Sequence, residues 1–208
     1  MPTSHIVLLV EEPSMEAFLQ SFLPRVLPRR TSFEVHAFQD KTDLIGKLEA
    51  RLRAYAQWLP EDWRLFVIVD RDDDDCDALE RSLDEIATRA GLRTPSSAPG
   101  DAAWQIVHRI AVEELEAWYF GDWAAVRAEF PRVSPNVPQR QGFRDPDAIL
   151  GGTWEAFERV LQHHGYFKEG LPKIDTARRL GSRLQIDECR STSFRAFRGA
   201  LLEALQAP

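Results

Sequence analysis

Residues 65–75, LFVIVDRDDDD, decide the fold, because five consecutive apolar residues run directly into a cluster of aspartates. A short and continuous apolar run is expected of a strand that is covered on both faces. HIVLLV, residues 5–10, is a second run of this kind, and Glu11 and Glu12 follow it at once. Two buried strands that each end in acid favour an α/β fold with polar groups gathered at one edge of a sheet.

The segments around these two runs complete the pattern. FEVHAF at 33–38 alternates apolar and polar residues, and QIVHRIAV at 105–112 also predicts a strand. Leucines and aromatic residues recur at helical spacing between the strands, in residues 18–27, 44–59 and 79–86. Strands separated by helices imply a mainly parallel sheet with right-handed crossovers. We therefore expect an α/β core in residues 1–125.

The second part of the chain, residues 126–208, has a different character. Four prolines mark a loop-rich stretch between residues 131 and 146. Helical patterns follow around residues 154–163, 173–184 and 193–206. We expect a loop-rich and helical extension that packs on the core.

Composition sets the class of protein. The 208 residues are 44% hydrophobic and 28% charged, as in an ordinary globular protein. No apolar run approaches the roughly 20 residues that a membrane span requires. The first residues lack the basic region of a signal peptide, and only two cysteines are present, which suggests a reducing compartment. We expect a cytoplasmic protein that does not contact a membrane.

The net charge of −7 is unevenly distributed along the chain. Residues 151–208 carry a net charge of +2, whereas the remainder carries −9. The basic residues concentrate between positions 173 and 198 and are Lys173, Arg178, Arg179, Arg183, Arg190, Arg195 and Arg198. This stretch fits either a surface that faces phosphates or a set of solvated helix faces.

Acidic residues follow three of the predicted strands: Glu11-Glu12, Asp70-x-Asp72 and Glu113-Glu114. In open α/β sheets, ligand sites lie beyond the carboxyl ends of the strands. Carboxylates crowded in this way repel one another, so a cation or a raised pKa must hold them together. Oxygen ligands without a His or Cys cluster favour Mg²⁺ or Mn²⁺ over zinc.

Other interpretations of the acidic run are weaker. The later aspartates, from Asp73 onward, suit a solvated turn and a helix amino terminus. A calcium loop of the EF-hand type starting at Asp70 would need Gly at position 75 and Glu at position 81, where Asp75 and Arg81 stand. No GxxxxGK[ST] motif is present, which excludes a P-loop nucleotide hydrolase. A phosphoacceptor receiver domain would need Ser or Thr after the fourth strand, where acids stand.

HIVLLVEEPSMEAFL followed by FVIVDRDDDD resembles the Glu and Asp-x-Asp signature of TOPRIM domains, which topoisomerases, primases and OLD-type nucleases share. Further segments resemble, in order, one bacterial TOPRIM-like family that includes the nuclease subunit of the PARIS anti-phage system. These segments are FQDKTDLIGKL, RIAVEELEAWYFGD, FRDPDAI and STSFRAF. The resemblance implies that Glu11 is the catalytic Glu and that Asp70 and Asp72 bind metal, with Glu114 or Glu116 as a further carboxylate.

One departure from the TOPRIM pattern concerns the first helix. The Gly usual after the first Glu is Glu12, and the acid usual four residues after that Glu is Met15. Either Glu12 or Glu16 can take over the role of the missing carboxylate.

The expected function is Mg²⁺-dependent hydrolysis of phosphodiester bonds, with Lys173 or a nearby Arg meeting the charge that builds on the phosphate. The resemblance implies an anti-phage effector that cleaves nucleic acid, such as tRNA or DNA, and an ABC-type ATPase partner that restrains it. The small acidic core favours a homodimer. The alternative is a regulatory module that binds metal and a nucleotide without cleaving and is controlled by the ATPase partner.

Overall fold

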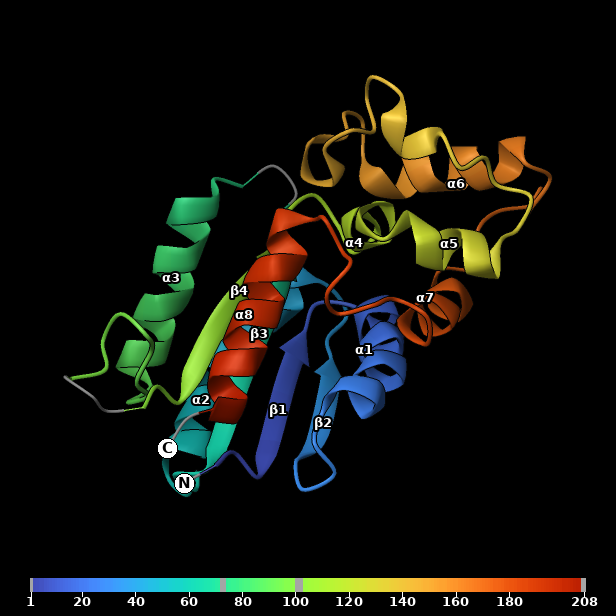
Figure 1. Cartoon of the computed structure of the whole chain (residues 1–208). Coiled ribbons are helices and arrows are strands. Elements are labelled where there is room, and N and C mark those ends of the chain that lie inside the picture. Colours follow the sequence, from blue (N-terminus) through green and yellow to red (C-terminus); the bar gives the residue numbers. More distant parts are fainter. Residues whose placement is uncertain (1, 72–73, 100–102, 207–208) are drawn as a thin grey trace.

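The computed structural model describes residues 2–71, 74–99 and 103–206. Four parallel strands form one sheet in the order β2-β1-β3-β4 (Figure 1). The strands are β1 (His5–Val10), β2 (Ser32–Ala37), β3 (Trp63–Asp70) and β4 (Ile106–Ala111). The predicted parallel α/β sheet is confirmed, and β3 extends one residue further than its apolar run, so that Asp70 is its last residue.

Two helices cover one face of the sheet. They are α2 (Lys41–Ala56) and α3 (Cys76–Arg89), which lie together on one side in Figure 1. Alternate strand residues, among them Val7, Leu9 and Val67, pack against the leucines of these helices. The burial of both alternating sets of strand residues explains the continuous apolar runs at residues 6–10 in β1 and 65–69 in β3.

The opposite face is covered by α1 (Pro13–Val26) and α8 (Thr192–Gln206), which is the last helix of the chain (Figure 1). The helix α7 (Lys173–Gly181) packs on the outer side of α1. A Cβ atom at Gly181 would lie 2.4 Å from the carbonyl oxygen of Phe18, so the two helices approach at this glycine to backbone contact.

The remaining helices lie beyond the carboxyl edge of the sheet (Figure 1). They are α4 (Glu116–Gly121), α5 (Trp123–Glu129) and α6 (Thr153–His163), with the short 3₁₀ helices η1 (Val137–Gln139) and η2 (Pro146–Ala148) between α5 and α6. Glu113, which follows β4, stays outside α4, because its φ of 67° is one that a right-handed helix does not admit.

The helical extension and the α/β core share one hydrophobic cluster. Phe18 and Trp118 from the first part of the chain lie in it together with Phe157, Phe194 and Phe197 from the second. The two parts therefore bury a common core. The division of the chain into two parts at residue 125 stays a prediction. Within the described residues, no helix is both long and apolar enough to cross a membrane.

Candidate metal centre

The ends of β1 and β3 bring two of the predicted ligands together. Glu11 directly follows β1, and Asp70 ends the neighbouring strand β3. The backbone N–H of Asp70 donates a hydrogen bond of 2.9 Å to Oε2 of Glu11. The pairing of the two strands thus fixes the Glu11 carboxylate beside Asp70.

Asp70 lies at the centre of a group of carboxylates. Its side chain is buried, and burial raises its pKa well above the ordinary range of a carboxyl group. The nearby charges of Glu11, Glu12, Glu116 and Glu114 raise the pKa further, in that order. Repulsion between crowded carboxylates is relieved either by protonation or by a bound cation. This group needs one of the two.

Glu116 enters the same group from the first turn of α4 and is only 2% exposed. Burial raises its pKa to about 8, Lys173 opposes the rise, and Glu114 and Glu12 add to it. The Nζ atom of Lys173 lies 4.4 Å from the centre of the Trp154 ring. The structure therefore brings Lys173, from the start of α7, to the carboxylates at the sheet edge.

Tyr119 supplies a polar atom without a partner. Its side chain is buried, and among the described residues its hydroxyl has no hydrogen-bond partner. Burial raises its pKa well above the ordinary value, and the charges of Glu116, Glu12 and Asp70 raise it further. A buried hydroxyl without a hydrogen bond costs free energy, so this atom is available to a water molecule or a ligand beside the acids.

Two further acids are held by specific partners. Oε2 of Glu114 accepts hydrogen bonds from the backbone N–H of Trp154, at 2.7 Å, and from Oγ1 of Thr153, at 3.1 Å. Glu114 thereby caps the amino terminus of α6. Glu113, whose φ is 67°, forms an ion pair with Arg71.

The two candidates for the missing TOPRIM acid lie in different places. Glu12 belongs to the central group, and its Oε1 accepts a hydrogen bond from Ser14. Glu16 lines a separate hollow of about 610 Å³ beside β2. Met15 is 2% exposed and packs in the core. Asp72 lies outside the described residues.

Sequence reasoning missed three contributors to this edge. Tyr119, Arg71 and Lys41 were not among its candidate site residues. Nζ of Lys41 donates to the carbonyl of Arg71 at 3.1 Å and pairs with Asp74 at 3.0 Å. The position of Lys41 at the start of α2, just beyond β2, was the available signal, because the carboxyl ends of parallel strands share one edge.

The donor set at this edge suits a hard divalent cation, because the groups that raise the pKa of Asp70 are all carboxylates. Glu11 and Asp70 are the two described residues that would hold such an ion. Among residues 2–71, 74–99 and 103–206, no three or more His, Cys, Asp or Glu side chains are grouped to hold a metal. The third predicted ligand, Asp72, lies outside these ranges.

The basic residues of the last segment are mostly paired. Arg179 and Arg183 contact Glu129, and Arg198 contacts Asp187. Arg178 lies 3.6 Å from Asp175. These pairs favour the interpretation of this stretch as solvated helix faces for the residues concerned, and they leave Lys173 and Arg190 to be considered separately.

Comparison with known proteins gives one match. A family model described as "Domain of unknown function (DUF4276)" covers residues 10–202. No curated protein and no solved structure matches the chain. None of these comparisons connects the chain with TOPRIM domains, OLD-type nucleases or the PARIS system, so that resemblance stays a prediction. Because the family model spans most of the chain, the protein belongs to the family described as Domain of unknown function (DUF4276).

Proposed function

We propose that the protein is a TOPRIM-type nuclease that hydrolyses phosphodiester bonds with the help of Mg²⁺ or Mn²⁺. One observation carries the proposal: the Glu11 carboxylate is fixed against the end of β3, beside the buried Asp70, within a group of further carboxylates. In the proposal Glu11 and Asp70 hold the metal together with Asp72.

The electrostatics of the edge support a cation there. The surrounding carboxylates raise the pKa of Asp70 and of Glu116, which means that bringing these groups together as anions costs free energy. Lys173 only partly offsets the effect of burial at Glu116. A bound divalent ion would supply the missing positive charge, polarise a phosphate oxygen and lower the pKa of water.

The residues of the chain would divide the remaining tasks. Glu12, Glu114 and Glu116 surround the two ligands, and Glu114 is fixed through its bonds to α6. Lys173 lies next to this group and can meet the negative charge that develops on a phosphate. The unpartnered hydroxyl of Tyr119 can donate a hydrogen bond to a water molecule or a phosphate oxygen.

The resemblance to the TOPRIM-like family extends the proposal. The substrate would be tRNA or another RNA, or DNA, and the protein would act in the cytoplasm as the effector of an anti-phage system. An ABC-type ATPase would restrain it, and two copies would form a homodimer. These extensions rest on the resemblance and the composition alone.

The test is incubation of the purified chain with tRNA and with duplex DNA, in Mg²⁺ and in EDTA. We expect cleavage of at least one substrate in Mg²⁺ only. Glu11→Ala should abolish it, whereas Glu85→Ala, which removes an exposed acid on α3, should not change the rate. Mg²⁺-dependent cleavage that persists in Glu11→Ala at the wild-type rate contradicts the proposal.

The second candidate is the regulatory module that binds without cleaving. Both candidates would use the same metal site, so only cleavage separates them. It predicts that the protein binds Mn²⁺, measured by calorimetry, while tRNA, total RNA and plasmid DNA stay intact.

A further inference from the structure

A second hollow lies away from the carboxylates. It has a volume of about 700 Å³ and is formed by α5, the segment 135–139 and the segment 183–190, which connects α7 with α8. The helix α4 links the two places, because Glu116 at its start belongs to the acidic group and Gly121 at its end lines the hollow. Five residues of α-helix rise by roughly 7.5 Å along the helix axis.

Hydrogen bonds fix the walls of this hollow. Asp122 is 2% exposed and accepts from the backbone N–H groups of Ala125, at 3.0 Å, and Gln185, at 2.8 Å. Nε1 of Trp123 donates to the carbonyl of Ser134 at 2.9 Å. The backbone N–H of Arg190 donates to the carbonyl of Gly121 at 3.0 Å. A cavity with walls fixed in this way needs little reorganisation when a ligand binds.

The side chains around the hollow divide into an apolar wall and a charged rim. Trp123, Pro135 and Pro138 belong to the wall. Arg127 and Arg190 belong to the rim, and in the described part of the chain neither guanidinium has a hydrogen bond or an ion pair. Arg183 also lines the hollow but is held by Glu129, at 2.6 Å. Glu188 is the exposed acid of the rim.

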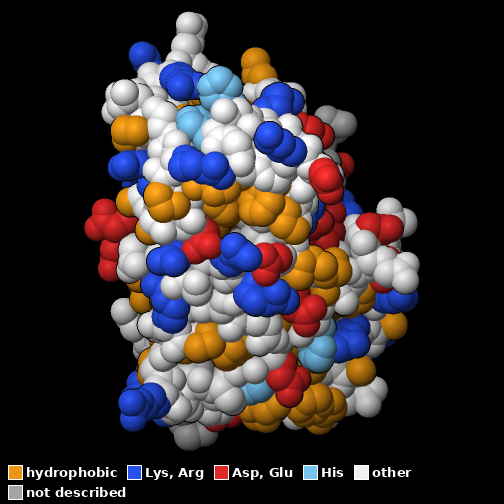
Figure 2. All heavy atoms as spheres, turned by 90° about the vertical axis from the view of Figure 1, so that its right-hand side faces the viewer, with side chains coloured by type: hydrophobic (Ala, Val, Ile, Leu, Met, Phe, Trp, Pro, Cys, Tyr) orange, Lys and Arg blue, Asp and Glu red, His pale blue; other side chains and the backbone are white. Residues whose placement is uncertain are grey.

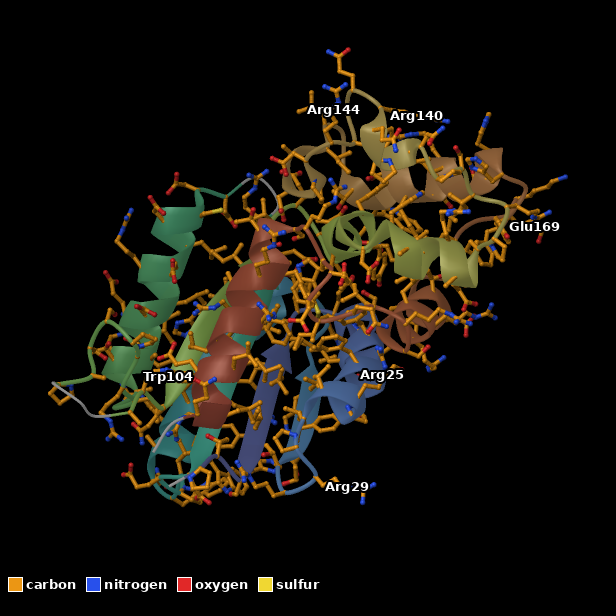
Figure 3. The ribbon with its side chains drawn as sticks, in the orientation of Figure 1. Arg25, Arg29, Trp104, Arg140, Arg144 and Glu169 are labelled. Carbon is orange, nitrogen blue, oxygen red and sulfur yellow. The ribbon has the colours of Figure 1, made fainter. Side chains whose placement is uncertain are left out.

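The two arginines without partners differ from most basic residues nearby. On the face seen in Figure 2, Lys and Arg side chains are interspersed with acidic ones and form no continuous basic patch. The described ion pairs of Arg178, Arg179 and Arg198 agree with this picture. Arg140 and Arg144 project outward from their loop (Figure 3). At this hollow, therefore, an apolar wall and two unpaired guanidinium groups lie together.

An apolar wall with two free guanidinium groups matches a base joined to a phosphate. Aromatic and apolar side chains contact the faces of bases, and arginine binds phosphate through charge-assisted hydrogen bonds. We propose that this hollow binds a nucleoside monophosphate group, either as the free nucleotide or as one unit of a nucleic-acid strand. The second source rests on the proposed function, because a strand cut at the acidic edge would continue past α4.

The test measures binding while EDTA keeps divalent metal ions away from the acidic centre. The full chain is titrated in EDTA against a fluorescently labelled, single-stranded oligonucleotide, with free nucleoside monophosphates and inorganic phosphate as competitors. We expect a nucleoside monophosphate to compete better than inorganic phosphate, because only the former contacts the apolar wall. Competition by the free nucleotide identifies a small-molecule site, and binding of the strand without such competition identifies a strand site. Both results support the hollow, and the absence of all binding overturns it.

Matched variants assign the binding to the rim. The pair Arg127→Gln and Arg190→Gln should weaken binding by roughly tenfold or more, through the loss of charge-assisted hydrogen bonds. The pair Arg29→Gln and Arg30→Gln removes the same charge from the loop before β2, far from the hollow (Figure 3), and should have little effect. Equal weakening by both pairs overturns the proposal, since it would indicate attraction by net charge alone.

A third variant guards against simple misfolding. Glu188→Gln should strengthen binding several-fold at low salt, because it removes the acid that competes with the phosphate at the rim. A damaged fold does not strengthen binding, so a gain here supports the site, and weaker binding contradicts it. All these measurements are made in EDTA, and hence they stay valid whether or not the Glu11 variant shows that the protein is a nuclease.

Discussion

The acidic edge of the sheet and the helical extension are both rich in charged residues, but these residues differ in their burial and in their partners. At the edge, Asp70 and Glu116 are buried, and the other carboxylates raise the pKa of each. In the extension, Glu129 contacts both Arg179 and Arg183, so that its charge is matched at the surface. The fold thus buries acids beside one another at one place and pairs an acid with arginines at the surface at the other.

The difference distinguishes buried carboxylates, which need a ligand to compensate their charge, from surface ion pairs, which need none. Exposed ion pairs contribute about 0–1 kcal/mol each, and replacing them is inexpensive. Buried carboxylates lose their solvation and require a compensating partner. A protein that keeps several such acids together at the carboxyl ends of its strands gains stability when a cation binds there. Of the three predictions below, the first and the last test this contrast and the second tests the packing of the extension on the core; they begin with the largest expected effect.

Asp70→Asn should separate activity from stability. We expect Mg²⁺-dependent cleavage to fall by at least roughly a hundredfold, since even outer partners of a metal site cost 10–100-fold. The unfolding free energy of the metal-free protein at pH 8 should rise, because a buried acid that resists ionisation is gone. Nuclease assays and urea denaturation measure the two effects. Arg179→Gln serves as the control and should change the unfolding free energy by less than about 1 kcal/mol. A fall in stability with unchanged cleavage in Asp70→Asn would reverse the contrast.

Gly181→Ala tests how firmly the extension is docked. The new Cβ atom would lie 2.4 Å from the carbonyl oxygen of Phe18 and 3.2 Å from its Cα atom, so α7 would have to move away from α1. We expect a loss of about 2–3 kcal/mol in the unfolding free energy, measured by urea denaturation. The matched control is Gly199→Ala in α8, where nothing lies within 4 Å, and it should stabilise the protein by about 0.5–1 kcal/mol. Equal effects of the two changes would mean that α7 does not pack closely on the core.

Glu116→Gln tests the acidic edge through pH. The pKa of Glu116 is raised to about 8 in the folded protein, and so the folded state retains a proton that the unfolded chain releases near pH 4.5. Between these two values the stability of the wild type should fall as the pH rises, and it should level off above pH 8. In EDTA, we expect Glu116→Gln to be similar to wild type near pH 5 and more stable by roughly 4 kcal/mol at pH 9. Thermal denaturation across this pH range measures the difference. A constant difference at all pH values would show that Glu116 ionises without hindrance.

The fold could be predicted to a large extent from local pattern. The continuous apolar runs of β1 and β3 each end in acid, which marked both the strands and the edge where the site lies. The helices α6, α7 and α8 also followed from their spacing of apolar residues. These features are encoded by neighbouring residues, and a single sequence is enough to read them.

The remaining features depend on contacts between distant residues. Nothing in the sequence near Glu114 indicates that its side chain caps α6, some 40 residues later. The same holds for Glu129, whose partners Arg179 and Arg183 lie 50 and 54 residues further along the chain. The unpartnered hydroxyl of Tyr119 could not be predicted either, because its helical spacing marked it only as a core residue. Charge pairing and hydrogen-bond satisfaction are properties of the packed chain.

The cap that Glu114 provides makes α6 a reporter of events at the sheet edge. The amide proton of Trp154 is bonded to a carboxylate that also acts on Asp70 and Glu116. Whatever draws Glu114 toward the acids would release that amide, and the first turn of α6 would then exchange its protons with solvent more quickly. Hydrogen exchange at one backbone position thus provides a direct signal of whether the edge is occupied, independent of any substrate.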